Sequence, residues 1–179
     1  MAVGWKGKID ITTNQSVSTG VVSTYQIPAS LSQTMDYAAG TSAGKADLLH
    51  AAQYSLAGSV QTINLQSLLD LSGATVNMAR VREIVIRMRS VTSGHVLTID
   101  TTVSNGFKVL GDGTTGIKQK LYANAASSTV FNTFWWQDKD SVGASTGGFT
   151  GSTSKNIALD PRANTFTVDV MILGCTATS

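Results

Sequence analysis

The chain of 179 residues is long enough for one domain with a full hydrophobic core. Charged residues make up only 13% of it, about half the usual share, and the formal net charge is +2. This composition excludes a disordered, highly charged chain, and it gives no general electrostatic attraction to nucleic acid or a membrane surface. A single cysteine, Cys175, excludes a scaffold held by disulfides within the chain.

The N-terminal stretch "MAVGWKGKIDITTNQS" has weak patterning, so we predict an arm over 1–16 followed by a single domain over 17–179. The arm contains Trp5, an interface candidate, and we expect it to order only against a partner. It has no apolar run suited to a signal peptide, and no stretch of the chain has the eighteen or more apolar residues of a membrane span. We therefore expect a protein that is made in the cytoplasm and stays soluble or assembles there.

From residue 17 onward, apolar and polar residues alternate with a period of two, which is typical of strands that bury one face. The clearest runs lie at 46–56, 84–88, 97–99 and 166–172, and further candidates include "GVVSTYQI", "SLSQTMDY", "SVQTINL", "IKQKLYA" and "TVFNTFWW". About ten short strands are separated by turns rich in glycine and serine, with one helical candidate at 65–71. This pattern predicts an all-β sandwich or barrel.

Residues suited to metal binding are few and badly spaced. His50 and His95 are the only histidines, and neither has a second histidine or a cysteine at zinc-ligand spacing. His50 lies on an apolar strand face, which favours a hydrogen-bonded core histidine. The "GDG" at 111–113 and the "DKD" at 138–140 are interpreted as turns, and Cys175 as a small apolar residue of the last strand. We expect no metal and no cofactor.

Catalytic motifs are equally scarce. Glu83 is the only glutamate, and no pair among the ten aspartates is marked by its context as a glycosidase pair. The chain has no GxSxG elbow, no phosphate-cradling GxxxxGK[ST] and no GxGxxG after a strand. The sequence therefore favours a protein that works by binding, not an enzyme.

The segment "ARVREIVIRMR" carries four arginines within ten residues. If Ile84, Ile86 and Met88 face the core, Arg87 and Arg89 point outward together with Glu83. Aromatic residues do not alternate with these arginines, as they do in many nucleic-acid-binding surfaces. We interpret Arg87 and Arg89 as anchors of a protein interface or a solvated face.

Aromatic residues concentrate in "VFNTFWWQDKD". Strand alternation places Val130, Phe134 and Trp136 on one side, which is the better core candidate, and Phe131 and Trp135 on the other. Because both faces then carry large apolar groups, a neighbouring subunit, a capsid surface or a sugar should cover the second face. Phe131 and Trp135 are the predicted contact residues.

Two long segments carry a family resemblance. "GTSAGKADLLHAAQYSLAGSVQTINLQSLLDLSGATVNMARVREIVIRM" (Gly40 to Met88) and "IALDPRANTFTVDVMILG" (Ile157 to Gly174) resemble small capsid decoration, or cement, proteins of tailed bacteriophages. The resemblance implies an antiparallel β-sandwich of jelly-roll type, with eight to ten strands and little or no helix. Asn64 stands where such proteins often have Asp, and the arginine-rich strand and the Trp pair are departures from the pattern.

The resemblance also implies a function. We expect a virion structural protein that binds the major capsid protein, works as a homo-oligomer, most simply a trimer, and sits on the capsid surface after assembly in the host cytoplasm. Nucleic acid and membranes are not expected partners. The alternative is a carbohydrate-binding or host-receptor-binding β-sandwich of a phage tail or fibre, using Trp135 or Trp136.

Overall fold

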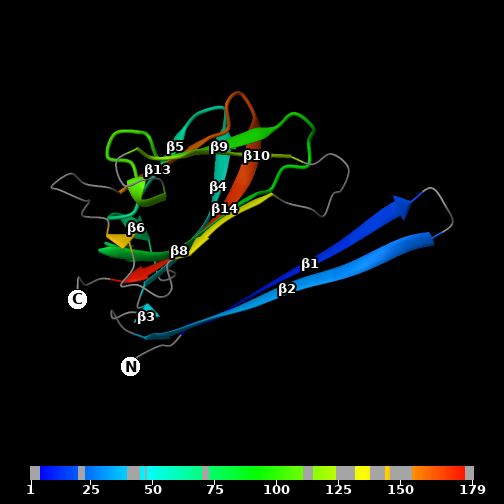
Figure 1. Cartoon of the computed structure of the whole chain (residues 1–179). Coiled ribbons are helices and arrows are strands. Elements are labelled where there is room, and N and C mark those ends of the chain that lie inside the picture. Colours follow the sequence, from blue (N-terminus) through cyan, green and yellow to red (C-terminus); the bar gives the residue numbers. More distant parts are fainter. Residues whose placement is uncertain are drawn as a thin grey trace.

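The computed structural model describes residues 5–19, 23–39, 45–46, 48–69, 73–110, 115–123, 132–137, 144–145 and 155–175, with the backbone alone for 5–39. Eight strands of this part of the chain form two four-stranded sheets that face each other (Figure 1). They are β4 (Leu48–Ala57), β5 (Gln61–Asn64), β8 (Arg80–Met88), β9 (Val96–Asp100), β10 (Lys118–Tyr122), β11 (Thr133–Gln137), β13 (Asn156–Asp160) and β14 (Thr165–Cys175).

The order of the strands is that of a jelly roll. One sheet runs β11-β8-β14-β4 and the other β10-β9-β13-β5, and every pairing within them is antiparallel. The first of the eight strands therefore lies beside the last, and the second beside the seventh, as two interlocked Greek keys require. The predicted all-β, antiparallel sandwich is confirmed.

Short elements complete the sandwich. Strands β6 (Leu68–Leu69) and β7 (Thr75–Val76) pair with each other, β12 (Ala144–Ser145) pairs with β8, and Lys108–Leu110 form one turn of 3-10 helix. The helical turn suggested for 65–71 is wrong in its described part, because Leu68–Leu69 extend into β6.

Alternating side chains of the two sheets form the core. Ile84, Ile86 and Met88 of β8 are fully buried, and they share the main cluster with Leu97 and Ile99 of β9. Burying a side chain of this size contributes about 1.5–3 kcal/mol. The alternation that predicted these strands is therefore the pattern that holds the two layers together.

A β-bulge separates the two ends of β8. The register of β14 on β8 shifts between Leu173, opposite Glu83, and Gly174, opposite Val81, so Arg82 is the extra residue. A Cβ on Gly174 would lie 2.4 Å from the carbonyl oxygen of Arg80, so the close approach of the two strands requires glycine. The bulge lets Val81 reach the core while Glu83, two residues on, lies on the opposite face.

An N-terminal hairpin lies outside both sandwich sheets. Strands β1 (Trp5–Thr19) and β2 (Ser23–Ala39) pair antiparallel from end to end, and the ribbon extends away from the sandwich (Figure 1). The end of β2 pairs in parallel with β3 (Lys45–Ala46). The expected boundary at residue 16 falls inside β1, and "GVVSTYQI" and "SLSQTMDY", expected as separate strands, contribute to the single strand β2. The pairing of β1 with β2 runs through residue 16 without a break in register, so no strand ends at that boundary.

The register of the hairpin sorts its residues by polarity. Odd-numbered residues of β1 pair with odd-numbered residues of β2, so they share one face of the ribbon. The opposite face, with Lys6, Lys8 and Asp10, is polar except for Pro28 and Ala38. We call the first face the apolar hairpin face; its apolar members are Trp5, Ile9, Ile11, Val17, Tyr25, Ile27, Ala29, Leu31, Met35 and Tyr37.

Candidate interaction face

The β11-β8-β14-β4 sheet has a second face, turned away from the core, which we call the outer face. Strand alternation and register place the same positions of neighbouring strands side by side there. Its members include Leu49, Ala51 and Gln53 of β4, Asp169, Met171 and Leu173 of β14, Glu83, Val85 and Arg87 of β8, Arg89 just after β8, and Thr133, Trp135 and Gln137 of β11.

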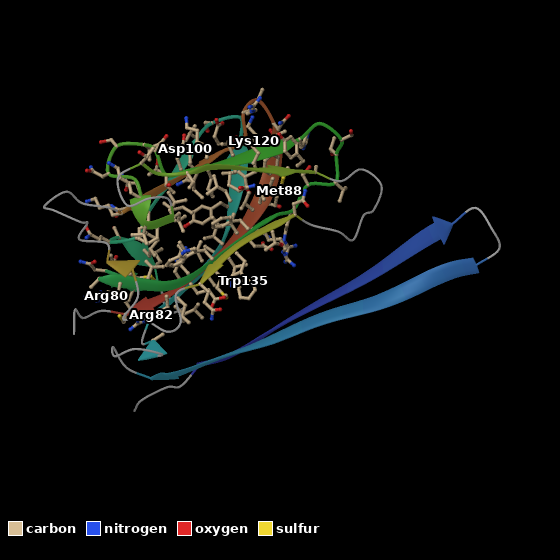
Figure 2. The ribbon with its side chains drawn as sticks, in the orientation of Figure 1. Arg80, Arg82, Met88, Asp100, Lys120 and Trp135 are labelled. Atoms are coloured by element: carbon tan, nitrogen blue, oxygen red, sulfur yellow. The ribbon has the colours of Figure 1, made fainter. Side chains whose placement is uncertain are left out.

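Trp135 and Trp136 lie on opposite faces of β11. Phe134 and Trp136 pack against the main core, and the ring of Trp136 meets Phe107 edge to face with centroids 6.0 Å apart. Trp135 is half-buried and belongs to the outer face, where it is opposite Val85 (Figure 2). The prediction that Phe134 and Trp136 face the core and that Trp135 faces outward is confirmed.

Trp135 is tied to a buried carboxyl group. Its indole Nε1 donates a 2.6 Å hydrogen bond to Oε1 of Glu83, whose side chain is fully buried. The second oxygen of Glu83, Oε2, is also buried, and it has no hydrogen-bond partner among the described residues. Burial raises the pKa of Glu83 to about 7, although the indole hydrogen bond acts in the opposite direction. Glu83 is therefore partly protonated near neutral pH.

A charged network crosses three strands beside this pair. Oδ2 of Asp169 accepts hydrogen bonds from Nη2 of Arg87 and from Nε of Arg89, each at 2.6 Å, and Oδ1 accepts one from Gln53. Partial burial alone would raise the pKa of Asp169, but the hydrogen bonds from Gln53, Arg89 and Arg87 hold it below its usual value. The two arginines and one aspartate leave a net positive charge on this part of the outer face.

An apolar patch adjoins the network. Leu173 of β14 and Ala46 of β3 are buried against each other, and half-buried Leu49, Trp135 and Met171 pack around them. We call these five residues the apolar patch. Strand β3, which continues the pairing of β2, thus covers one end of the outer face and brings the base of the hairpin next to it.

Three of the five sequence-predicted interface residues come together on this face. Arg87, Arg89 and Trp135 share it, whereas Trp5 lies in β1 opposite Tyr37, and Phe131 is outside the described residues, as is Val130. Sequence reasoning missed Asp169, which accepts hydrogen bonds from both Arg87 and Arg89. The alternation of Phe166, Val168 and Val170 already placed it on the opposite face, but no local signal indicates that β14 lies beside β8.

Other expectations from the sequence concern the interior. His50 is a buried, hydrogen-bonded histidine, as predicted: Nδ1 donates to the carbonyl oxygen of Leu69 at 2.6 Å, and Nε2 lies 3.0 Å from the hydroxyl of Tyr54. Cys175 is fully buried at the end of β14, also as predicted. The "GDG" turn at 111–113 and the "DKD" turn at 138–140 both lie outside the described residues.

Within the described ranges, no group of three or more His, Cys, Asp or Glu side chains is arranged to hold a metal ion. A search of the same part of the chain finds no helix with the length and apolar character needed to cross a membrane. Comparison of the chain with protein-family models, curated proteins and solved structures gives no match. The chemistry present on the outer face joins carboxylates to arginine, amide and indole donors, which is an arrangement suited to recognition.

Proposed function

We propose that this protein is a structural protein of a tailed-phage virion, which binds the assembled capsid as a homo-oligomer and stabilises it. The observation that carries the proposal is the outer face, where Trp135 and the apolar patch lie beside Arg87 and Arg89. Aromatic residues and arginine are the side chains most enriched at the centres of protein interfaces. The resemblance of 40–88 and 157–174 to capsid decoration proteins supports the same function.

The exposure of these side chains suits a docking surface. The side chains of Arg87 and Arg89 keep 41% and 40% of their surface accessible while Asp169 fixes their position. Side chains held in place by an intrachain partner lose less conformational entropy when a second protein binds. A carboxylate or a main-chain carbonyl of the major capsid protein is the chemistry that such arginines would recognise.

The physical role of a decoration protein follows from where it binds. A protein that contacts two neighbouring capsid subunits must be detached, or the subunits must separate from it, before the shell opens under internal DNA pressure. An interface of about 1,200–2,000 Å² at each contact is sufficient for stable attachment. The protein then acts on the capsid surface of the virion, with the major capsid protein and copies of itself as partners, and performs no catalysis.

The test uses empty expanded capsids assembled from the major capsid protein of the same genome. Full-length protein should co-sediment with these shells and raise the temperature at which they rupture. The double variant Arg87→Ala/Arg89→Ala should bind at least tenfold more weakly, because removing one partner of a buried interface ion pair costs about 2–5 kcal/mol.

The control is Lys118→Ala/Lys120→Ala, which removes two cations from β10 on the other sheet, one of them also paired with an aspartate. This control should bind as the parent does. Equal binding by the arginine variant, or no binding by the parent, would contradict the proposal. Sugar-dependent quenching of tryptophan fluorescence that is lost in Trp135→Phe would instead favour a host-recognition role.

A further inference from the structure

We propose that the apolar hairpin face of one copy packs on the outer face of a second copy of this chain. The inference rests on the homo-oligomer part of the proposed function and is independent of the capsid. Two surfaces hold the oligomer together: the apolar hairpin face of one copy, formed by β1 and β2, and the outer face of the next copy, which carries the apolar patch.

The hairpin needs a covering layer. A two-stranded hairpin is at best marginally stable in water, and three strands or a packed face are needed to hold it. Here fifteen residue pairs form the ribbon, and its register gathers residues such as Ile9, Ile11, Leu31 and Tyr37 on the same side. Exposing this whole face to water would forgo the burial that stabilises the rest of the protein.

Its length takes the hairpin beyond its own sandwich. With a rise of about 3.4 Å per residue, the 15 residues of β1 span about 50 Å, whereas the 11 residues of β14, the longest sandwich strand, span about 37 Å. The hairpin is attached at its base, through β2 and β3, at one end of the outer face, and it extends away from the sandwich (Figure 1). Its far half therefore reaches past its own subunit.

A second copy provides a surface of matching shape. Its outer face is a sheet with Val85, Trp135 and Met171 half-buried, and β layers pack face to face about 10 Å apart. A ribbon about 50 Å long and 10 Å wide covers about 500 Å², so each contact removes about 1,000 Å² from both partners. If every subunit gives one hairpin and receives another, up to about 500 Å² is buried on its hairpin and up to about 500 Å² on its outer face. The total of up to about 1,000 Å² per subunit is comparable with the roughly 800 Å² per partner of a standard protein interface.

The charges of the two surfaces are compatible with this contact. Lys6, Lys8 and Asp10 lie on the opposite, polar face of the hairpin, which the proposed contact leaves uncovered. Arg87, Arg89 and Asp169 lie beside the apolar patch and form a polar rim. In the proposed contact the hairpin covers the apolar part of the outer face, and the two arginines of the rim stay accessible for the capsid. Because one chain carries both complementary surfaces, identical copies can close into a symmetric ring or dimer, with a trimer as the simplest ring.

The first experiment measures the mass of the full-length protein in solution by light scattering over a range of concentrations. The parent should be an oligomer at micromolar concentration. Ile11→Asp places a charge on the apolar hairpin face and should raise the dissociation constant at least tenfold. Thr12→Asp is the matched control, because it adds the same charge to the next residue on the polar face, and it should leave the mass unchanged.

The second experiment identifies the receiving surface by cross-linking. Cys175 is fully buried, so single cysteines added elsewhere can be labelled selectively. A mixture of an Ile11→Cys chain and a Met171→Cys chain should give cross-linked heterodimers with a short bis-maleimide. A mixture of Thr12→Cys and Met171→Cys chains should give at least fivefold fewer. Cross-links formed only between two Ile11→Cys chains would overturn the assignment of the outer face.

A monomer at all concentrations would overturn the inference, as would an oligomer that Ile11→Asp leaves intact. The thermal unfolding midpoint of each variant shows whether the sandwich is still folded, since the hairpin lies outside its two sheets. An oligomer with these properties that does not bind capsids would overturn the proposed attachment to the capsid and leave this inference standing.

Discussion

The indole nitrogen of Trp135 donates a 2.6 Å hydrogen bond to Oε1 of Glu83, across the pairing of β11 with β8. This hydrogen bond holds a fully buried carboxyl group, whose other oxygen meets no hydrogen-bond partner in the part of the chain that the structure describes. The pair joins the two features that stand out in the sequence, the arginine-rich strand and the Trp pair. It also makes the outer face sensitive to pH.

Stability should fall as pH rises toward and past neutrality. The pKa of Glu83 is about 7 in the folded protein, compared with the ordinary value of 4.5 for a glutamate. The folded state therefore binds this proton more tightly, so its contribution is complete below about pH 4.5 and is lost as pH rises through about 7. The loss by pH 8.5 should approach about 3 kcal/mol. Urea unfolding at pH 5 and pH 8.5 measures it.

Glu83→Gln is the matching variant. The amide keeps an oxygen for the indole N–H and cannot lose a proton in this range, so the decline between pH 5 and 8.5 should be much smaller than in the parent. The variant should then be the more stable protein at pH 8.5. Parallel pH profiles for the two proteins would show that Glu83 does not titrate as described.

The two adjacent tryptophans should differ in what their removal costs. Trp136→Ala empties a core site next to Phe107 and should destabilise the isolated protein by about 3–5 kcal/mol. Trp135→Phe keeps a ring on the outer face and removes the donor to Glu83, so it should cost about 1–3 kcal/mol. Denaturant unfolding of the monomeric fraction compares them, and equal costs would contradict the division of faces.

Asp169→Asn should have a small effect on stability and a larger one on assembly. The side chain keeps 27% of its surface accessible, so its ion pairs with Arg87 and Arg89 contribute about 0.2–1 kcal/mol. The pKa of Asp169 lies below its usual value of 3.8, so this contribution is present above that pH and is lost as pH falls below it. Thermal unfolding of the parent and of Asp169→Asn at pH 7 and pH 3 measures this contribution to stability and its loss at low pH. A loss of several kcal/mol at pH 7 would mean that the network is part of the core.

Gly106 should not tolerate any side chain. A Cβ at this position would lie 1.9 Å from the carbonyl oxygen of Thr101, and a backbone atom cannot rotate away. Gly106→Ala should therefore cost at least about 3 kcal/mol, the upper end for overpacking. Gly94→Ala is the control: its φ of +84° brings backbone strain of about 1–2 kcal/mol, but among the described residues no atom beyond its chain neighbours lies within 4 Å of the added Cβ. Similar thermal shifts for both variants would contradict the close contact.

Deletion of residues 2–12 should leave the sandwich intact and weaken association. These residues provide all the β1 partners of residues 30–37 in β2, and they belong to none of the strands of the two sandwich sheets. The thermal midpoint should fall by less than about 2–4 °C, which corresponds to about 1 kcal/mol in a chain of this size. An unfolded product, or association as strong as that of the full chain, would contradict this prediction.

The local alternation of the sequence determined much of the fold and part of the candidate face. Successive side chains of a strand point to opposite sides, so "TVFNTFWW" alone was enough to separate Trp135 from Trp136, and "REIVIRMR" alone placed Arg87 and Arg89 opposite Ile84 and Ile86. The number of strands and the near absence of helix followed in the same way. His50 was predicted as a core residue because it continued an apolar face.

Only the tertiary structure decided which strands are neighbours and in which register. Asp169 meets Arg87 across 82 residues of sequence, and Trp135 meets Glu83 across 52, so neither pair has a local signal. The bulge at Arg82 and the continuous pairing of β1 with β2 through residue 16 depend on the partner strand as well. The side of the strand on which each residue lies follows from the alternation within its own segment. Register is fixed only when a whole sheet closes around its core, and the outer face depends on that register.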